Sequence, residues 1–183
     1  MGLAMVGSLN QLAAVAALSL SVAACATGSS DYYGSDSASV NGGQIVRLAN
    51  PVECVPYARE KSGIQIWGDA YTWWQQAAGR YSRDGQPSTG AVLVLDNYAG
   101  PYRAHLAVVH NIVSAREIRV DHANWLDDGN IYLNDPVIDV STANDWSQVR
   151  VFNLETNAWG GHVYDVRGFI SPASPPAQVV AGR

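Results

Sequence analysis

A cysteine at the start of a predicted helix is the first residue in this sequence that can do chemistry. Cys54 lies two residues before Pro56, and proline is favoured in the first helical turn because its missing N–H needs no partner there. Cys54 to Ser62 therefore predicts a short helix that ends at Gly63. A helix N-terminus lowers the pKa of a thiol, and the thiolate is the nucleophilic form. Cys54 is a candidate nucleophile; the alternative is a small, buried apolar residue.

His105 is the candidate base, because a thiol nucleophile is most often activated by histidine. It opens the run "HLAVV". Strand alternation places His105, Ala107 and Val109 on one face and His110 on the other. Both faces of the run are largely apolar, which predicts a strand inside the sheet. His110 and the late His162 are interpreted as structural.

The third group of the candidate site comes from the next run, "EIRVDHANW". It predicts a strand that pairs with the His105 strand in a hairpin turning near residues 114–116. His122 and Asn124 lie on one face of this second strand, with His105 roughly opposite Asn124 and diagonal to His122. Either side chain can hold the second ring nitrogen of His105 and fix its tautomer.

A zinc site formed by Cys54, His105 and His122 is the metal alternative, since thiolate and imidazole are zinc ligands. These three residues lack the close ligand spacing of a usual metal motif. No cofactor is expected.

The composition favours one folded domain and argues against a nucleic-acid-binding protein. The chain has 183 residues, 48% of them hydrophobic and six of them tryptophan, which is enough to bury a core. The net charge is −5 and the 11 Lys and Arg residues are scattered. Phosphate contacts need clustered basic residues, so no nucleic-acid partner is expected.

The N-terminal segment is similar to a bacterial lipoprotein signal. Leu12 to Cys25 is almost wholly small or apolar and is too short for a confident membrane span. It ends in "VAAC", where the cysteine of a lipobox would be lipidated and become the mature N-terminus. The first 11 residues contain no Lys or Arg, which is a departure from such signals. Ordinary secretion with cleavage around Ala24-Cys25-Ala26 and a buried N-terminal helix are the alternatives. If Cys25 is lipidated or removed, Cys54 is the free thiol of the mature domain.

Composition divides the chain into four parts. Residues 1–25 predict the signal peptide with its lipobox, residues 26–43 a flexible linker, residues 44–170 the folded domain, and residues 171–183 a tail rich in Pro and Ala.

Within the folded domain, helical patterns come first and strand patterns follow. Asp69 is a plausible N-cap of a second helix that ends at Gly79. From Ala91 onward the chain has short β-rich runs separated by Gly, Asn, Asp and Pro. Helices followed by antiparallel strands predict an α+β fold.

Taken together, these stretches resemble the CHAP domain, the cysteine, histidine-dependent amidohydrolase/peptidase. The resemblance is carried by Cys54-Val-Pro-Tyr-Ala-Arg, Gly63-Ile64, Gly68-Asp69-Ala70 with Trp73-Trp74, Pro87 to Leu95, His105-Leu-Ala-Val-Val, and Ile118 through Asn124-Trp125. It extends over about Val52 to Trp125 and more weakly to Ile170. It implies a papain-like/NlpC-like α+β fold, with N-terminal helices packed on an antiparallel sheet of about five to six strands.

By this resemblance Cys54 matches the nucleophile and His105 the base. Family members usually have Gly where Ala104 stands, and many have Glu as the third residue, where His122 stands, with Asn two positions later, as at Asn124. Histidine as the third residue is familiar among NlpC-type relatives. Cys54, His105, His122 and Asn124 are the candidate catalytic residues, with His122 preferred over Asn124 as the partner of His105.

The resemblance also implies the substrate. An exported, lipid-anchored CHAP-like domain faces the bacterial cell wall, at the outer membrane or in the periplasm if the host is Gram-negative. The implied activity is peptidoglycan hydrolysis by an N-acetylmuramoyl-L-alanine amidase or a peptide endopeptidase that works through a Cys thioester. The alternatives are a catalytically silent module for wall binding or envelope assembly, and an acyltransferase with the same Cys-His site. The expected partners are peptidoglycan and, through a lipid on Cys25, the membrane; the chain is expected to be a monomer.

Overall fold

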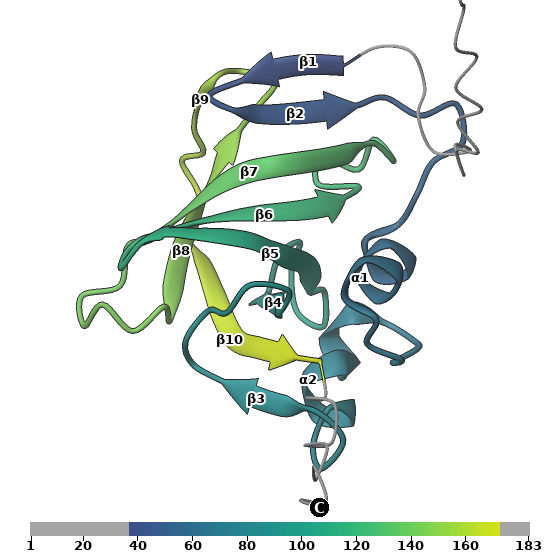
Figure 1. The fold of residues 1–183 in the computed structure, drawn as a ribbon, viewed down its shortest axis with the longest axis vertical. Helices are drawn as coiled ribbons and strands as arrows, with labels where there is room; N and C mark the ends of the chain where they lie inside the picture. The colour runs from purple at the N-terminus through teal and green to yellow at the C-terminus, as the bar shows by residue number, and fades with distance from the viewer. Residues whose placement is uncertain (1–36, 173–183) are drawn as a thin grey trace, which may run out of the picture. The chain divides into compact units, whose positions relative to one another are not determined.

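The computed structural model describes residues 37–172 (Figure 1). The helices are α1 (Cys54–Ser62), the 3-10 helix η1 (Ala70–Thr72) and α2 (Trp73–Gln76). The strands are β1 (Ser37–Val40), β2 (Gly43–Val46), β3 (Ser82–Asp84), β4 (Val92–Asp96), β5 (His105–Ser114), β6 (Glu117–Ala123), β7 (Ile131–Asp139), β8 (Gln148–Asn153), β9 (Ala158–Trp159) and β10 (Tyr164–Ser171).

Several sequence predictions concern residues outside this range. The signal peptide with Cys25, the linker up to residue 36 and the tail from residue 173 lie outside the described residues. The remaining residues assigned to the linker form β1 and the first residue of β2, and these two strands pair antiparallel. Within residues 37–172, no helix has the length and apolar character needed to cross a membrane.

Six antiparallel strands close into a barrel. Each strand pairs with the next around the ring β7-β6-β5-β4-β10-β8, and β8 pairs again with β7. The closing pairs join Val137 to Val151 between β7 and β8, and Tyr164 to Val149 between β10 and β8. The other strands extend this barrel: β2 and β1 follow β7, β3 pairs with β10, and β9 pairs with β8.

The predicted fold class was therefore wrong. The described residues are mostly β, with a closed barrel and only short helices, and they do not form N-terminal helices packed on an open sheet. The predicted second helix is reduced to η1 and the four-residue α2, in a stretch where Tyr, Thr and Trp have modest helix propensity. The β-rich runs were recognised from sequence, but barrel closure depends on β4 pairing with β10, about 70 residues later in the chain.

Helix α1, which begins with Cys54, agrees with the prediction. It ends at Gly63, whose φ of 74° lies in the left-handed region and whose N–H donates to the carbonyl of Arg59. Glycine adopts this conformation without steric penalty, so the helix ends where the sequence indicates.

Strand β5 lies between two apolar clusters, which confirms that it is interior to the sheet. Ala107 and Val109 belong to the cluster that fills the barrel. Leu106 and Val108 face the other way and pack with Ala58 of α1, so α1 lies beside β5 (Figure 1). His105 shares the face of Ala107 and Val109 by strand alternation, so its imidazole lies on the barrel side of β5.

Candidate active site

Two histidines and one aspartate form a buried hydrogen-bonded chain. His105 Nε2 lies 3.0 Å from His122 Nδ1, and His122 Nε2 lies 3.0 Å from Asp135 Oδ2. His105 and His122 are 2% and 1% exposed, and Asp135 is 0% exposed. The predicted partnership of His105 with His122 is thus present as a direct contact.

The β5–β6 hairpin brings the two histidines together. Strand β5 ends at Ser114 and β6 begins at Glu117, and these two residues pair, so the turn lies where the sequence predicted it. Ala107 pairs with His122, so His105, two residues earlier on β5, lies diagonal to His122. This register was predicted from the sequence and is confirmed.

A β-bulge in β7 places Asp135 beside His122. Between the pairs Val120–Asp135 and His122–Tyr132, β6 advances by two residues while β7 advances by three. The extra residue turns Asp135 to the face that carries Tyr132, and Asn134 adopts a left-handed φ of 53° at the bulge. Simple alternation places Asp135 and Tyr132 on opposite faces, which is why the sequence analysis missed Asp135. The available signal was Asn before Asp in a strand, because Asn tolerates left-handed conformations.

Aromatic rings surround the two imidazoles. The ring centroid of Trp125 lies 4.9 Å from that of His105 and 5.1 Å from that of His122. Tyr98 lies 5.0 Å from His105 and Tyr132 lies 5.5 Å from His122. The Tyr98 hydroxyl donates to the backbone carbonyl of Trp125. These rings exclude water from the imidazoles, which disfavours the charged form of His105.

Cys54 lies beside the start of β5 and lines an open hollow. It lies near the backbone N–H of Leu106, the residue after His105, which favours the thiolate form. The hollow has a volume of about 430 Å³ and is also lined by Glu53, Asp69, Tyr71, Tyr102 and Arg103. Among the described residues, the Cys54 and His105 side chains are not hydrogen-bonded to each other. The thiol faces the hollow and the imidazoles are buried, so a ligand in the hollow meets the thiol first.

Burial decides the charge of the thiol and the imidazole. It raises the pKa of Cys54, and the neighbouring N–H groups of Leu106 and Val55 oppose this only in part. Burial holds the pKa of His105 well below its ordinary value, and the electrostatic interaction with His122 lowers this pKa further. The N–H groups at the helix start lower the thiol pKa as expected, but burial outweighs them, so the net shift of the Cys54 pKa is upward, opposite to the expected one. The resting pair is a neutral thiol with a neutral imidazole.

Alkylation of Cys54 by iodoacetamide is expected to follow a thiol pKa above the ordinary value of about 8.5. Burial stabilises the neutral thiol, so less thiolate is present at neutral pH than in the unfolded chain, and labelling accelerates only as the pH rises through the raised pKa. The measurement is the labelling rate of the Cys54 peptide against pH by mass spectrometry, with the urea-unfolded chain as reference. A midpoint well below the ordinary value contradicts the neutral pair and indicates a thiolate–imidazolium pair with His105.

Asn124 contacts Glu53, the residue before Cys54, and not His105. Its Nδ2 donates to Glu53 Oε2 at 2.9 Å, and its Oδ1 accepts from the backbone N–H of Gly129 at 2.8 Å. Its φ is 58°, in the left-handed region. Asn124 therefore joins the loop after β6 to the residue before Cys54, while His122 contacts His105.

The sequence of the region that holds this site matches a known family. Residues 46–124 match the CHAP domain. The resemblance predicted from the sequence is confirmed. No curated protein matched the chain.

The CHAP match indicates the general activity. CHAP domains are hydrolytic cysteine, histidine-dependent amidohydrolases or peptidases, and their activity is related to peptidoglycan. Cys54, His105, His122 and Asn124 all lie within the matched residues, whereas Asp135 lies beyond them.

The other two histidines have partners outside the His105–His122 pair. His110 Nδ1 contacts Asp121 Oδ2 at 3.0 Å, and Lys61 Nζ contacts the same oxygen at 3.2 Å. His162 is exposed, with its ring 4.4 Å from that of Tyr164. Within residues 37–172, no group of three or more His, Cys, Asp or Glu side chains is arranged to hold a metal ion.

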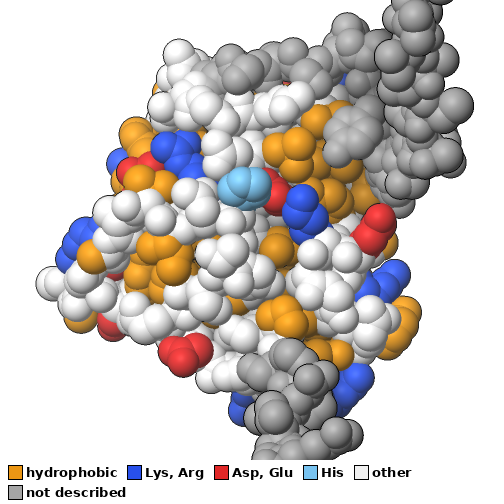
Figure 2. Space-filling view, in the orientation of Figure 1, with side chains coloured by type: hydrophobic (Ala, Val, Ile, Leu, Met, Phe, Trp, Pro, Cys, Tyr) orange, Lys and Arg blue, Asp and Glu red, His pale blue; other side chains and the backbone are white. Residues whose placement is uncertain are grey.

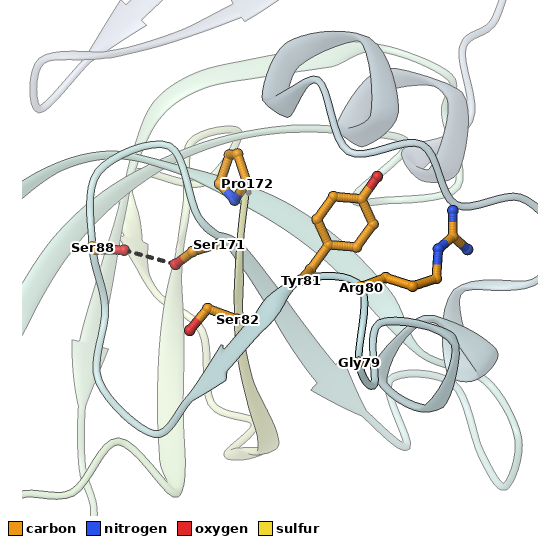
Figure 3. Close-up of a pocket in the computed structure, with 7 residues that line it drawn as sticks. All are labelled: Gly79, Arg80, Tyr81, Ser82, Ser88, Ser171 and Pro172. Atoms are coloured by element: carbon orange, nitrogen blue, oxygen red, sulfur yellow. Dashed lines mark hydrogen bonds between the residues drawn. The ribbon is translucent and has the colours of Figure 1, made fainter. Parts of the chain in front are cut away.

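A second hollow, of about 570 Å³, shares no lining residue with the hollow at Cys54 (Figure 3). It is lined by Gly79, Arg80, Tyr81, Ser82, Ser88, Ser171 and Pro172. Ser88 and Ser171 are hydrogen-bonded at 3.1 Å across it. These described lining residues include no thiol, imidazole or carboxylate, so this hollow has no nucleophile–base pair.

Proposed function

We propose that this protein is a peptidoglycan hydrolase that cleaves an amide bond through a thioester on Cys54. The bond is either the N-acetylmuramoyl-L-alanine amide or a peptide bond within the stem peptide. The observation that carries this proposal is Cys54, which lines an open hollow next to Leu106, the residue after His105 of the buried His105–His122 pair, within residues that match the CHAP domain.

In the first half of the reaction His105 acts as a general base. Its Nε2 contacts His122, so Nδ1 is the nitrogen left to receive the thiol proton. As this proton moves, sulfur attacks the amide carbonyl and a tetrahedral intermediate forms. The C–N bond then breaks, the amine leaves with the proton from His105, and a thioester remains on Cys54.

In the second half a water molecule replaces the amine. His105 takes a proton from the water, the hydroxyl attacks the thioester, and the C–S bond breaks to release a carboxylic acid and the thiol. The backbone N–H of Cys54, at the N-terminus of α1, is the proposed donor to the oxyanion in both halves.

The lining of the hollow suits a charged peptide. Glu53 and Asp69 supply carboxylates and Arg103 supplies a guanidinium. Tyr71 and Tyr102, which are 43% and 79% exposed, pack edge to face with ring centroids 6.0 Å apart. Charges of both signs beside exposed rings can pair with the carboxyl and amino groups of a stem peptide and stack on its apolar parts.

The face shown in Figure 2 has no basic patch of the kind that would indicate a polyanionic ligand. There Lys and Arg side chains are scattered singly among acidic, hydrophobic and neutral ones, and they form no single basic patch. A scattered pattern of this kind supports a peptide substrate over a polyanion on that face.

Digestion of purified peptidoglycan by the full-length protein, followed by mass spectrometry of released fragments, tests the proposed function. The wild type is expected to release fragments that carry a new amine and a new carboxylate, and their masses identify the bond. Cys54→Ala is expected to release none above the background, because no other described group can form the thioester.

Three other results would replace this proposal. A folded wild type that binds peptidoglycan without cleaving it is a silent wall-binding module. Products in which an amine acceptor replaces water indicate an acyltransferase. Release that continues in Cys54→Ala assigns the chemistry to another group.

We also propose that the protein is exported and anchored by a lipid on Cys25, on the basis of "VAAC" after an apolar run. Anchoring raises the local concentration of the domain at the wall. The mass of the mature N-terminus tests this, and an unmodified chain that starts near Thr27 indicates plain secretion instead.

A further inference from the structure

We propose that Asp135 is a positioning residue that fixes the tautomer of His105 through His122. The inference rests on the proposed function, in which His105 is the base for Cys54. The observation is the continuous chain from His105 Nε2 to His122 Nδ1 and from His122 Nε2 to Asp135 Oδ2, with both contacts at 3.0 Å.

The direction of hydrogen bonding follows from the end of the chain. A carboxylate can only accept, so Asp135 requires a proton on His122 Nε2. In neutral His122 the other nitrogen, Nδ1, is then an acceptor, and it requires a proton on His105 Nε2. Neutral His105 is left with an unprotonated Nδ1, which is the form a base needs. One carboxylate thereby selects the reactive tautomer of an imidazole that it does not touch.

The same chain reverses when Asp135 is protonated. A carboxylic acid donates to His122 Nε2, His122 Nδ1–H then donates to His105 Nε2, and the proton of His105 moves to Nδ1. The base is lost although every residue is still present. Burial raises the pKa of Asp135, whereas the hydrogen bond from His122 and the charge of Arg119, both on β6, oppose this rise. Activity is therefore expected to fall, as the pH is lowered, at a higher pH than an ordinary carboxylate would give.

Nothing else in the described structure accounts for this carboxylate. Asp135 is fully buried, its other oxygen, Oδ1, has no hydrogen-bond partner among the described residues, and its Oδ2 pairs with His122. Burying a carboxylate costs free energy, and a side chain kept only for packing would be apolar at this position.

Asp139 is the matched control on the same strand. It is also buried, at 4% exposed, and its Oδ2 also lacks a hydrogen-bond partner. Its Oδ1 accepts from the backbone N–H of Ser141 and its Oδ2 lies 3.7 Å from Arg116. It contacts neither histidine, so its loss disturbs the strand without disturbing the chain.

The test reads the tautomer directly by two-dimensional NMR of the full-length protein with ¹⁵N-labelled histidine. The chain has four histidines, so single substitutions assign their signals. In the wild type near neutral pH, His105 is expected to be protonated at Nε2 and unprotonated at Nδ1. In Asp135→Leu, and in Asp135→Asn, whose amide can donate as well as accept, His105 is expected to become a mixture of tautomers or to be protonated at Nδ1.

Activity follows the tautomer. Asp135→Leu is expected to lower kcat on peptidoglycan about tenfold or more with little change in KM, below the roughly 10⁴-fold loss of the serine-protease example in which the acid itself contacts the base. Asp139→Asn is expected to keep the wild-type tautomer and pH profile, even where melting shows similar destabilisation. A wild-type His105 protonated at Nδ1, or an unchanged tautomer in Asp135→Leu, overturns the proposal. The NMR measurement needs no substrate, so a protein that fails to cleave peptidoglycan refutes the proposed function and leaves the tautomer result to stand or fall separately.

Discussion

Replacing His105 with alanine is expected to lower kcat on peptidoglycan about 10³-fold or more. Burial raises the pKa of Cys54, so the thiol is not ionised on its own at neutral pH and depends on a base to lose its proton. His105 is the proposed base, and its lowered pKa keeps its imidazole unprotonated. The measurement is the initial rate of fragment release, with a melting curve to show that the variant is folded.

His110→Ala is the control for this prediction. His110 lies on the same strand but is half-exposed, and it contacts Asp121, not His105. It is expected to leave kcat nearly unchanged, although the lost contact can lower stability. The double variant Cys54→Ala/His105→Ala is expected to be no worse than Cys54→Ala alone, because base and nucleophile act as one unit. A His105→Ala variant that keeps more than about a tenth of the wild-type rate shows that Cys54 does not use this base.

His122→Ala is expected to lower kcat at least about tenfold more than Asn124→Ala. His122 contacts His105 at 3.0 Å, and its loss frees the imidazole to rotate or to change tautomer. Asn124 contacts Glu53 and the backbone of Gly129, so its loss loosens a loop without touching the base. Rates of fragment release for the two variants, taken at saturating substrate, decide between them.

The backbone of Asn124 calls for a second variant. An alanine in the left-handed conformation of Asn124, at φ 58°, would destabilise the folded protein by about 1–2 kcal/mol. Asn124→Ala therefore combines backbone strain with the loss of the side chain. Asn124→Gly removes the side chain without that strain and is the fairer comparison. If Asn124→Gly is more damaging than His122→Ala, the site is of the Cys–His–Asn type. If neither matters while Cys54 and His105 do, the protein works as a dyad.

Local sequence patterns predicted the parts of the site that depend on local geometry. Pro56 near the start and Gly63 at the end set the bounds of α1, because each favours one backbone conformation. Alternation and a short turn set the β5–β6 register, which placed His105 diagonal to His122. Both results needed only interactions between residues close in sequence, and strand and helix periods are enough to describe those.

The closure of the sheet and the third member of the hydrogen-bonded chain depended on distant parts of the sequence. Pairing of β4 with β10, and of β8 with both β7 and β10, turns a set of strands into a barrel, and each strand alone would suit an open sheet equally well. Asp135 reached His122 through a bulge that shifts the face of half a strand, and alternation has no means to predict one.

The sequence by itself determined the place of Cys54 at a helix start, of His105 at the start of β5 and of His122 diagonal to it on β6, and the resemblance to the CHAP domain. Only the tertiary structure decided that the strands close into a barrel, that His122 and not Asn124 contacts His105, and that Asp135 ends the chain. It also reversed the expected direction of the Cys54 pKa. The physical reason is the same in each case: residue type and period set local conformation, whereas burial and long-range pairing, which determine contacts and charge states, exist only once the chain has folded.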